Sequence, residues 1–261
     1  QLQPLLQAAL QRQLGQLNGH KVGVFLSGGL DSSIVAALLV RAGVDVQAYT
    51  LDFGADAGSE LPYAQQVADF LHIPLKAVPV TPRQVRRAIA PTATALDMPF
   101  GDGVTVPFFL LNQAAAADTR IIFNGENGDQ LFAGWTNKPL IAAGIYRTTG
   151  HTDLPAVDGK QPLEQPLESQ LGQQYLQTFH RLYGYEHQAF APDIVTQLRD
   201  FDPRAWLGDA LDPHHCQSFL HQMRRATLML KGAQNIQPRA TALGWAHGLQ
   251  VRSPFCDMAL S

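Results

Sequence analysis

Residues 27–33 combine types that suit phosphate binding, and they follow an apolar run. The segment reads S-G-G-L-D-S-S, and residues 21–26 before it read as a buried strand. The two glycines allow a tight turn and bring backbone N–H groups close to a ligand. The helix expected to begin near Asp31 adds its free amides and the positive end of its dipole. We therefore predict an anion-binding cradle at this turn.

Asp31 separates this cradle from the commonest phosphate loops. No Gly-Lys-Ser/Thr closes the segment, and it is not G-x-G-x-x-G. A carboxylate in a phosphate-binding loop is repulsive unless a cation lies between the charges, which implies Mg²⁺. A strand-to-helix turn capped by Asp and Ser is the plain alternative, but seven specific residues favour the cradle. The loop resembles the PP-loop of the N-type ATP pyrophosphatases, which cleave ATP to AMP and pyrophosphate.

A second motif, G-E-N-G-D-Q-L-F-A-G-W at residues 125–135, directly follows a strand expected at residues 120–124. Its acidic and amide residues would suit a capped helix entrance. However, a capping role would not explain why two carboxylates, Glu126 and Asp129, lie at the edge where an anion site is predicted. Asp129 can share Mg²⁺ with Asp31, and Glu126 can act as a base near the phosphates.

The pattern between the motifs alternates strands with helices. It predicts strands at 46–52, 75–80 and 120–124, with helices at 59–71, from 81 with an interruption around Pro91, and at 107–117. Such alternation is typical of an α/β fold with a doubly wound parallel sheet and right-handed crossovers. Ligands of these sheets bind at the carboxyl ends of the strands, where both motifs fall.

The chain is expected to divide into three parts. Residues 1–20 hold an N-terminal packing helix, 21–135 form the PP-loop core, and 136–261 form a mainly helical part that completes the site. Within the last part we expect a flexible connection at 161–171 and a small-residue helix at 240–249. His214, His215, Cys216 and His221 match no standard zinc spacing. The missing initiator Met and the abrupt end at Ser261 are typical of a fragment.

Composition excludes several classes of protein. The 261 residues carry a net charge of −3, which argues against a dedicated nucleic-acid surface. Two distant cysteines, Cys216 and Cys256, suit a reducing compartment. No apolar run reaches the ~18 residues of a membrane span and no signal peptide is visible. We therefore expect a cytoplasmic protein with small-molecule substrates and neither nucleic acid nor membrane as a partner.

Two further places could bind a substrate. Asp97 and Asp102 lie in the Gly/Pro-punctuated residues 96–106, where they either shape an amino-acid pocket or serve ordinary turn chemistry. We favour the turn role for Asp102 and leave Asp97 open. Arg252 and Asp257 flank a Pro-Phe turn, and they either contact a ligand or form a salt-bridged turn.

Three segments in order, S-G-G-L-D-S-S, G-E-N-G-D-Q-L-F-A-G-W and A-H-G-L-Q-V-R-S-P-F-C-D, resemble the synthetase domain of asparagine synthetases. The family fold is adenine-nucleotide alpha hydrolase-like. The resemblance implies a carbon–nitrogen ligase that binds ATP and Mg²⁺, adenylates a side-chain carboxylate such as that of aspartate, and lets ammonia displace AMP. The implied roles are adenosine contact for Leu26, Leu51 and Gly125; pyrophosphate binding for Ser27, Gly28, Gly29, Leu30, Asp31 and Ser32; magnesium binding for Asp31 and Asp129; and proton removal from the incoming nitrogen for Glu126.

The sequence also departs from this family. Gln130 replaces a usual acid, Cys256 a usual Leu, and Ala242 a basic residue for which Arg239 is the nearest substitute. The family lysine that stabilises the pentavalent phosphorus would lie beyond Ser261. No N-terminal nucleophilic cysteine occurs, so ammonia would come from solution or from a glutaminase domain or subunit absent from this chain.

Two alternatives to the amidoligase stay open. The departures fit a nucleotide-binding regulatory protein that has lost turnover. Another PP-loop enzyme, such as a β-lactam, peptide-cyclising or tRNA-modifying relative, is the second alternative. In the β-lactam synthetases a similar position typically holds Tyr, so Glu126 favours amidation between separate molecules.

Overall fold

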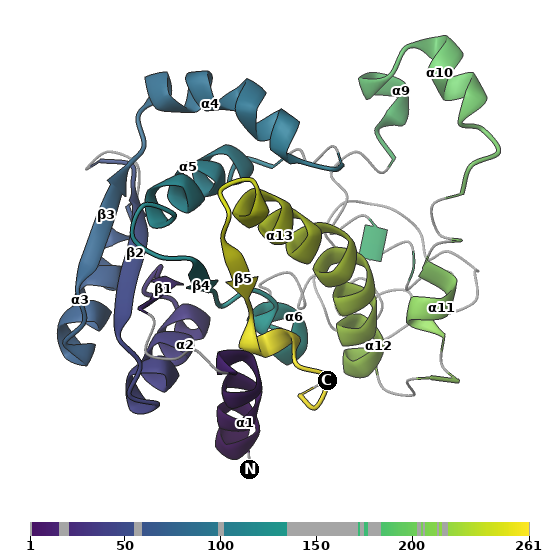
Figure 1. The fold of residues 1–261 in the computed structure, drawn as a ribbon. Coiled ribbons are helices and arrows are strands. Elements are labelled where there is room, and N and C mark those ends of the chain that lie inside the picture. The colour runs from purple at the N-terminus through teal and green to yellow at the C-terminus, as the bar shows by residue number, and fades with distance from the viewer. Residues whose placement is uncertain are drawn as a thin grey trace, which may run out of the picture. The chain divides into compact units, whose positions relative to one another are not determined.

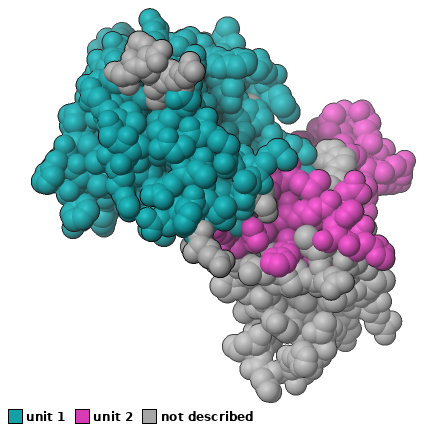
Figure 2. All heavy atoms as spheres, turned by 60° about the horizontal axis from the view of Figure 1, so that its bottom comes forward, with its two compact units in different colours: residues 1–131, 230–261 teal, residues 132–229 magenta. Residues whose placement is uncertain are grey.

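The computed structural model describes most of the chain. The described residues are 2–15, 21–54, 59–98, 102–134, 172, 175–176, 184–202, 205, 207–212, 214–215 and 219–260. They fall into two compact units, of which unit 1 comprises residues 1–131 and 230–261 and unit 2 comprises residues 132–229 (Figure 2). Each unit is described by itself below.

Unit 1 is built on a five-stranded parallel sheet with the strand order β3-β2-β1-β4-β5 (Figure 1). The strands are β1 (Val22–Phe25), β2 (Val46–Asp52), β3 (Leu75–Pro79), β4 (Ile121–Phe123) and β5 (Gln250–Arg252). The chain order reverses between β1 and β4, and that reversal leaves a crevice at the carboxyl ends of these strands. The predicted α/β fold is confirmed, and the strands expected at 46–52, 75–80 and 120–124 are present within a residue or two.

Helices cover both faces of this sheet (Figure 1). On one face lie α2 (Leu30–Arg41) and α3 (Leu61–Leu71), and on the other lie α5 (Thr105–Ala115) and α13 (Gln237–Trp245). The helix α4 (Pro82–Ala95) packs on α5, and α1 (Leu2–Leu14) contacts α2 and the turn after β5. Both faces of the sheet are therefore buried, which explains why β1 is apolar at each of its positions.

The interior between the sheet and α5 is a continuous apolar cluster. It is formed by Phe25, Tyr49, Val78, Leu111, Ala115, Ile122 and Leu249. Phe25 also meets the ring of Phe108 edge to face, with the centroids 5.6 Å apart. This cluster lies directly beneath the strand ends that carry the two motifs, so it supplies a rigid floor for them.

One prediction about local structure was wrong. The helix expected to break around Pro91 runs without interruption from Pro82 to Ala95. Its start is secured by a capping box, in which Gln84 N–H donates to the Thr81 hydroxyl and the Gln84 side chain bonds back to Thr81. Although Pro91 removes one backbone donor, capping and packing on α5 maintain the helix.

The last segment of the chain also differs from expectation. The helix expected at 240–249 ends at Trp245 as α13, and the chain then enters β5 and a 3₁₀ turn, η3 (Pro254–Cys256). Residues 230–261 therefore join the first 131 residues as unit 1, whereas we had grouped 136–261 as one helical part.

The described residues of unit 2 are mostly in short helices. These are α9 (Glu186–Ala189), α10 (Pro192–Gln197), α11 (Gly208–Leu211) and α12 (Phe219–Ala226). A π-helix, η2 (Thr227–Ile236), and the short α6 (Gly128–Phe132) each span a boundary between the units. The expected connection at 161–171 and Cys216 lie outside the described residues. In the part of the chain that the structure describes, no helix is long and apolar enough to cross a membrane, and no three His, Cys, Asp or Glu side chains gather as a metal site.

Candidate nucleotide and substrate site

A cavity of about 690 Å³ opens at the carboxyl ends of β1, β2 and β4. This volume is within the ~300–1,000 Å³ of small-molecule sites. Eight of the predicted site residues line it: Leu26, Ser27, Asp31, Ser32, Leu51, Gly125, Glu126 and Asp129. Six do not: Gly28, Gly29, Leu30, Asp97, Arg252 and Asp257. Both chemical motifs therefore face one cavity.

Hydrogen bonds of Ser27 and Ser32 fix the shape of the loop between β1 and α2. The Ser27 and Ser32 hydroxyl oxygens lie 3.1 Å apart, and Ser32 donates to the Gly29 carbonyl at 3.1 Å. Gly28 has φ +80°, and a Cβ there would lie 2.5 Å from the Tyr63 backbone on α3, so only glycine fits. The N-cap residue of α2 is Gly29, which has no side chain that could cap the helix. The helix therefore leaves amides available for an anion in the cavity.

The two motifs touch through a second glycine. A Cβ on Gly128 would overlap the carboxylate of Asp31, so a larger residue would push the two loops apart. The same close approach allows the Asp129 backbone N–H to donate a hydrogen bond to the Asp31 carboxylate. Asp31 and Asp129 are thus brought together from segments almost a hundred positions apart.

This proximity has an electrostatic cost. Burial, together with the charge of Asp129, raises the pKa of Asp31 above its ordinary value. Two carboxylates this close repel each other, and a divalent cation between them would relieve the repulsion. Mg²⁺ typically takes one or two protein carboxylates and completes its coordination with phosphate oxygens and water. The pair therefore fits magnesium bound together with a nucleotide.

Glu126 is a half-buried acid in the lining of the cavity. Burial raises the pKa of its carboxyl, and Asp102 and Asp129 raise it further, while Arg239 and Lys231 act in the opposite direction. Its backbone N–H donates to Asn124 Oδ1 at 3.2 Å. A carboxylate with a raised pKa is a better proton acceptor than an exposed one.

Asp102 is more than a turn residue, although we had favoured that role. It accepts hydrogen bonds from the Val104 and Thr105 backbones at 3.3 and 3.0 Å, and it also pairs with Arg239 inside the cavity. Burial acts to raise the pKa of Asp102, but the Thr105 hydroxyl and Arg239 outweigh it and hold the pKa below its ordinary value. Arg239 is only 6% exposed, so this basic substitute is a buried part of the site.

Several cavity residues were missed by sequence reasoning. They are Thr50, Phe53 and Glu60 near the end of β2 and the start of α3, and Lys231, Asn235 and Ile236 on η2. Glu60 follows the predicted edge of the second strand, a position that could have marked it. Its pKa is raised by burial. The η2 residues offered no such signal, because a π-helix has no characteristic apolar spacing in sequence. Such helices are nevertheless frequent at functional sites.

Arg252 and Asp257 are occupied elsewhere. The Arg252 guanidinium donates to the Gln13 and Leu14 carbonyls of α1, and both Asp257 oxygens accept from Arg12. Asp257 is thus salt-bridged to Arg12, and Arg252 bonds to backbone carbonyls. Asp97 is exposed. Substrate contact by these three residues remains a prediction.

Two curated proteins and one family profile resemble this chain in sequence. A mycobacterial protein (Mycobacterium bovis) provisionally named asparagine synthetase (glutamine-hydrolyzing) is 26% identical over 249 residues, which cover 90% of this chain and 37% of that protein. Asparagine synthetase (glutamine-hydrolyzing) 1 of Bacillus subtilis is 25% identical over 256 residues, covering 90% of this chain and 39% of the relative. The chain thus spans less than two fifths of the length of these curated relatives.

Among solved structures, a U34-tRNA thiolase from Methanococcus maripaludis aligns with a TM-score of 0.40 and 18% identity. The alignment covers 87% of this chain and 76% of the thiolase. A TM-score this low supports no inference about the site. The sequence profile of the asparagine synthase family, in contrast, matches residues 1–261. The loop at 27–33, the acidic motif at 125–135 and the cavity they share are therefore those of a chain that belongs to the asparagine synthase family.

Proposed function

We propose that this chain is the synthetase part of an ATP-dependent, AMP-forming amidoligase of asparagine synthetase type. It adenylates a side-chain carboxylate, with aspartate as the expected substrate, and transfers ammonia to give the amide. The observation that carries the proposal is the convergence of Asp31, Asp129 and Glu126 on one cavity beside the N-terminus of α2. Family membership supports the same reaction class.

The nucleotide half of the site is proposed from the family resemblance, and all of its residues except Gly28, Gly29 and Leu30 line the cavity. Leu26, Leu51 and Gly125 would contact adenosine, residues 27–32 would hold the pyrophosphate, and Asp31 with Asp129 would hold magnesium. When bound, Mg²⁺ neutralises the phosphate charge. Among the described residues, three cavity side chains carry buried polar atoms without a hydrogen-bond partner: Asn124 Nδ2, Asn127 Oδ1 and Arg239 Nε. Such atoms usually have a partner, which a ligand or water would supply here.

The reaction proceeds in two steps. A carboxylate oxygen of the substrate attacks the α-phosphorus, and the bond from that phosphorus to pyrophosphate breaks. The nitrogen of ammonia then attacks the acyl carbon, Glu126 accepts a proton from that nitrogen, and AMP leaves. Lys231 and Arg239 line the same cavity and supply positive charge near the reacting anions.

The remaining assignments concern partners. We propose small-molecule substrates only and a cytoplasmic location. The ammonia would come from solution or from a glutaminase domain or subunit. Both curated relatives are named as glutamine-hydrolyzing, which favours a glutaminase domain or subunit as the source of the ammonia.

Replacement of Glu126 by Gln tests the catalytic proposal in the full-length protein. The variant keeps the size of the side chain but cannot accept the proton, so amide formation should fall by ~10²- to 10⁴-fold. Formation of the acyl-adenylate, measured as carboxylate-dependent pyrophosphate exchange, should persist. Glu186→Gln, on α9 and outside the cavity lining, is the matched control. Wild-type amide formation by Glu126→Gln would remove Glu126 from catalysis.

A nucleotide-binding regulatory role is the second candidate. It is favoured by Gln130, which is 4% exposed and lines the cavity where the family usually has an acid, and by Ala242 in place of a basic residue. This role predicts ATP binding without pyrophosphate exchange for any carboxylate tested. Exchange by the full-length wild-type protein would exclude it.

A further inference from the structure

The helix α1 and the turn after β5 are joined by side-chain contacts. Arg12 Nε and Nη2 donate to the two oxygens of Asp257 at 2.8 and 2.6 Å. Gln13 Nε2 donates to the Ser253 carbonyl at 2.7 Å, and Arg252 donates back to the α1 carbonyls. Contacts in both directions fix this turn, residues 252–257, against α1.

The same turn is bonded to the loop that carries Glu126. The Ser253 hydroxyl donates to the Glu126 backbone carbonyl at 2.7 Å, and Asn127 Nδ2 donates to Cys256 Sγ at 2.8 Å. Ser253 is 5% exposed and Asn127 is 7% exposed, whereas Cys256 is exposed, so water competes less for the Ser253 contact than for the Cys256 contact. One contact is made by the carbonyl of the peptide bond that follows Glu126, and the other by the side chain of the next residue, Asn127.

The backbone at that point needs such support. Asn127 has φ +72°, a left-handed conformation that is uncommon for a residue other than glycine, although Asn tolerates it better than most. This conformation turns the chain sharply between Glu126 and Asp129, so both carboxylates face one cavity. Neither Ser253 nor Cys256 lines that cavity. Any effect of these two residues on the reaction must therefore pass through the loop.

We propose that Ser253 is a positioning residue for Glu126. The Asn127–Cys256 contact assists it, and α1 holds the turn in place. This inference rests on the proposed function, in which Glu126 handles a proton in the second step. A general base acts only within hydrogen-bond reach, about 2.6–3.2 Å, and a misplacement of ~1 Å can lower a rate by ~10²-fold. Loss of the Ser253 hydroxyl lets the loop relax away from that position.

The main test compares Ser253→Ala with Ser253→Thr in the full-length protein. Ser253→Ala should lower kcat for amide formation by ~10- to 100-fold, while pyrophosphate exchange and the KM for ATP stay within about twofold of wild type. Ser253→Thr keeps the hydroxyl and should recover most of the rate. A loss of stability alone would lower exchange and amide formation together, so the ratio of the two rates reports positioning.

Three further variants separate positioning from misfolding. Asn127→Gly suits the positive φ better but removes the contact with Cys256. It should therefore fold with an undiminished melting temperature and still form amide more slowly. Cys256→Ser keeps an acceptor for Asn127 and should behave like wild type, whereas Cys256→Ala should resemble Asn127→Gly. Wild-type amide rates in both Ser253→Ala and Asn127→Gly would overturn the proposal.

The outcome can be separated from the fate of the proposed function. If the wild-type protein makes no amide, the proposed function fails. Backbone amide hydrogen exchange at residues 126–131 then still decides whether the turn holds the loop, because it requires no turnover. Ser253→Ala should exchange faster than wild type at these residues and equally fast in β2. Unchanged exchange at residues 126–131 would overturn the role of Ser253.

Discussion

Two carboxylates at opposite ends of the same sheet lie in contrasting environments. Asp31, at the carboxyl edge, is half-buried next to Asp129, and both the burial and the neighbouring charge raise its pKa. Asp118, at the amino edge, accepts a hydrogen bond from Lys76 that holds its pKa below its ordinary value. Both residues precede or begin regular elements of unit 1. The difference between them therefore comes from their neighbours.

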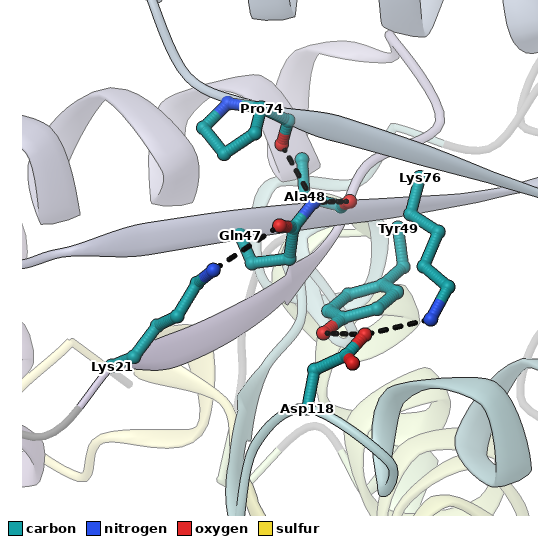
Figure 3. A network of polar contacts seen from close by, with 7 residues as sticks. All are labelled: Lys21, Gln47, Ala48, Tyr49, Pro74, Lys76 and Asp118. Carbon is teal, nitrogen blue, oxygen red and sulfur yellow. Dashed lines mark hydrogen bonds and ion pairs between the residues drawn. The ribbon is translucent and has the colours of Figure 1, made fainter.

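The amino edge is a satisfied polar network (Figure 3). Asp118 Oδ2 accepts from Lys76 Nζ at 2.7 Å and from the Tyr49 hydroxyl at 3.1 Å, while Lys76 Nζ lies 6.0 Å from the centroid of the Tyr49 ring. Burial, followed by the nearby Asp118 charge, raises the pKa of Tyr49. Beside it, Lys21 donates to Gln47 at 3.3 Å, and Gln47 donates to the Pro74 carbonyl at 3.0 Å.

The carboxyl edge lacks this balance. Asp31, Glu60 and Glu126 all have raised pKa values, and burial is the first cause for each. Perturbed carboxylates of this kind collect at functional sites, where the protein forgoes stability for binding or catalysis. The comparison therefore assigns stability to the amino edge and ligand chemistry to the carboxyl edge.

The largest expected effect is on the affinity for Mg·ATP, which should depend on Asp31 and not on Asp118. Asp31→Asn removes a proposed magnesium ligand, and even loss of residues behind a metal ligand typically lowers affinity ~10- to 100-fold. The variant should therefore bind Mg·ATP at least ~10-fold more weakly by calorimetry, while Asp118→Asn should bind like wild type. Equal Mg·ATP affinity of Asp31→Asn and wild type would sink the magnesium assignment.

The pH dependence of amide formation sharpens the comparison at Glu126. Since the pKa of Glu126 is raised, its base form is lost at a higher pH than the ~4.3 of an ordinary glutamate. As pH falls below that raised pKa, the rate of amide formation should drop about tenfold per unit. A rate profile in acid that is flat down to the ordinary glutamate value contradicts this assignment.

Stability should respond at the amino edge. Asp118→Ala removes the acceptor of the Tyr49 hydroxyl, and an unsatisfied buried hydroxyl costs about 1 kcal/mol or more. A melting temperature about 2–4 °C lower is expected, with Mg·ATP affinity unchanged. Tyr49→Phe in the same background removes the stranded hydroxyl and should restore part of the loss. No recovery would mean that the hydroxyl is not the cause.

The smallest effect is a gain of stability in Asp31→Asn without ligand. Because the folded pKa of Asp31 is raised, its ionisation opposes folding, and stability falls as pH rises through that pKa. The amide should remove this fall and stabilise the ligand-free protein by less than about 1 kcal/mol near neutral pH. Asp118 behaves oppositely: its contribution is present above its ordinary value of ~3.9 and is lost as pH falls through its lowered pKa. Lower stability of Asp31→Asn than of wild type at pH 7 would contradict the repulsion between Asp31 and Asp129.

Much of the fold follows from local pattern. Apolar runs followed by glycine turns predicted the strands, because a strand buried on both faces leaves few other compositions possible. The two motifs could be placed at one edge since parallel strands bring their carboxyl ends together. Capping and helix length were less predictable, as the uninterrupted passage of α4 through Pro91 shows.

Within the site, the sequence by itself determined the residues adjacent to the strand ends, including Asp31, Glu126 and Asp129. Each is within a few positions of a strand, so topology alone sets its place. Only the tertiary structure decided that Asp102 meets Arg239 and that η2 supplies Lys231 to the cavity, because these contacts depend on packing between distant segments. The same holds for Ser253 and Glu126, whose contact spans 127 positions. No local periodicity encodes a hydrogen bond between segments that meet only after the sheet has formed.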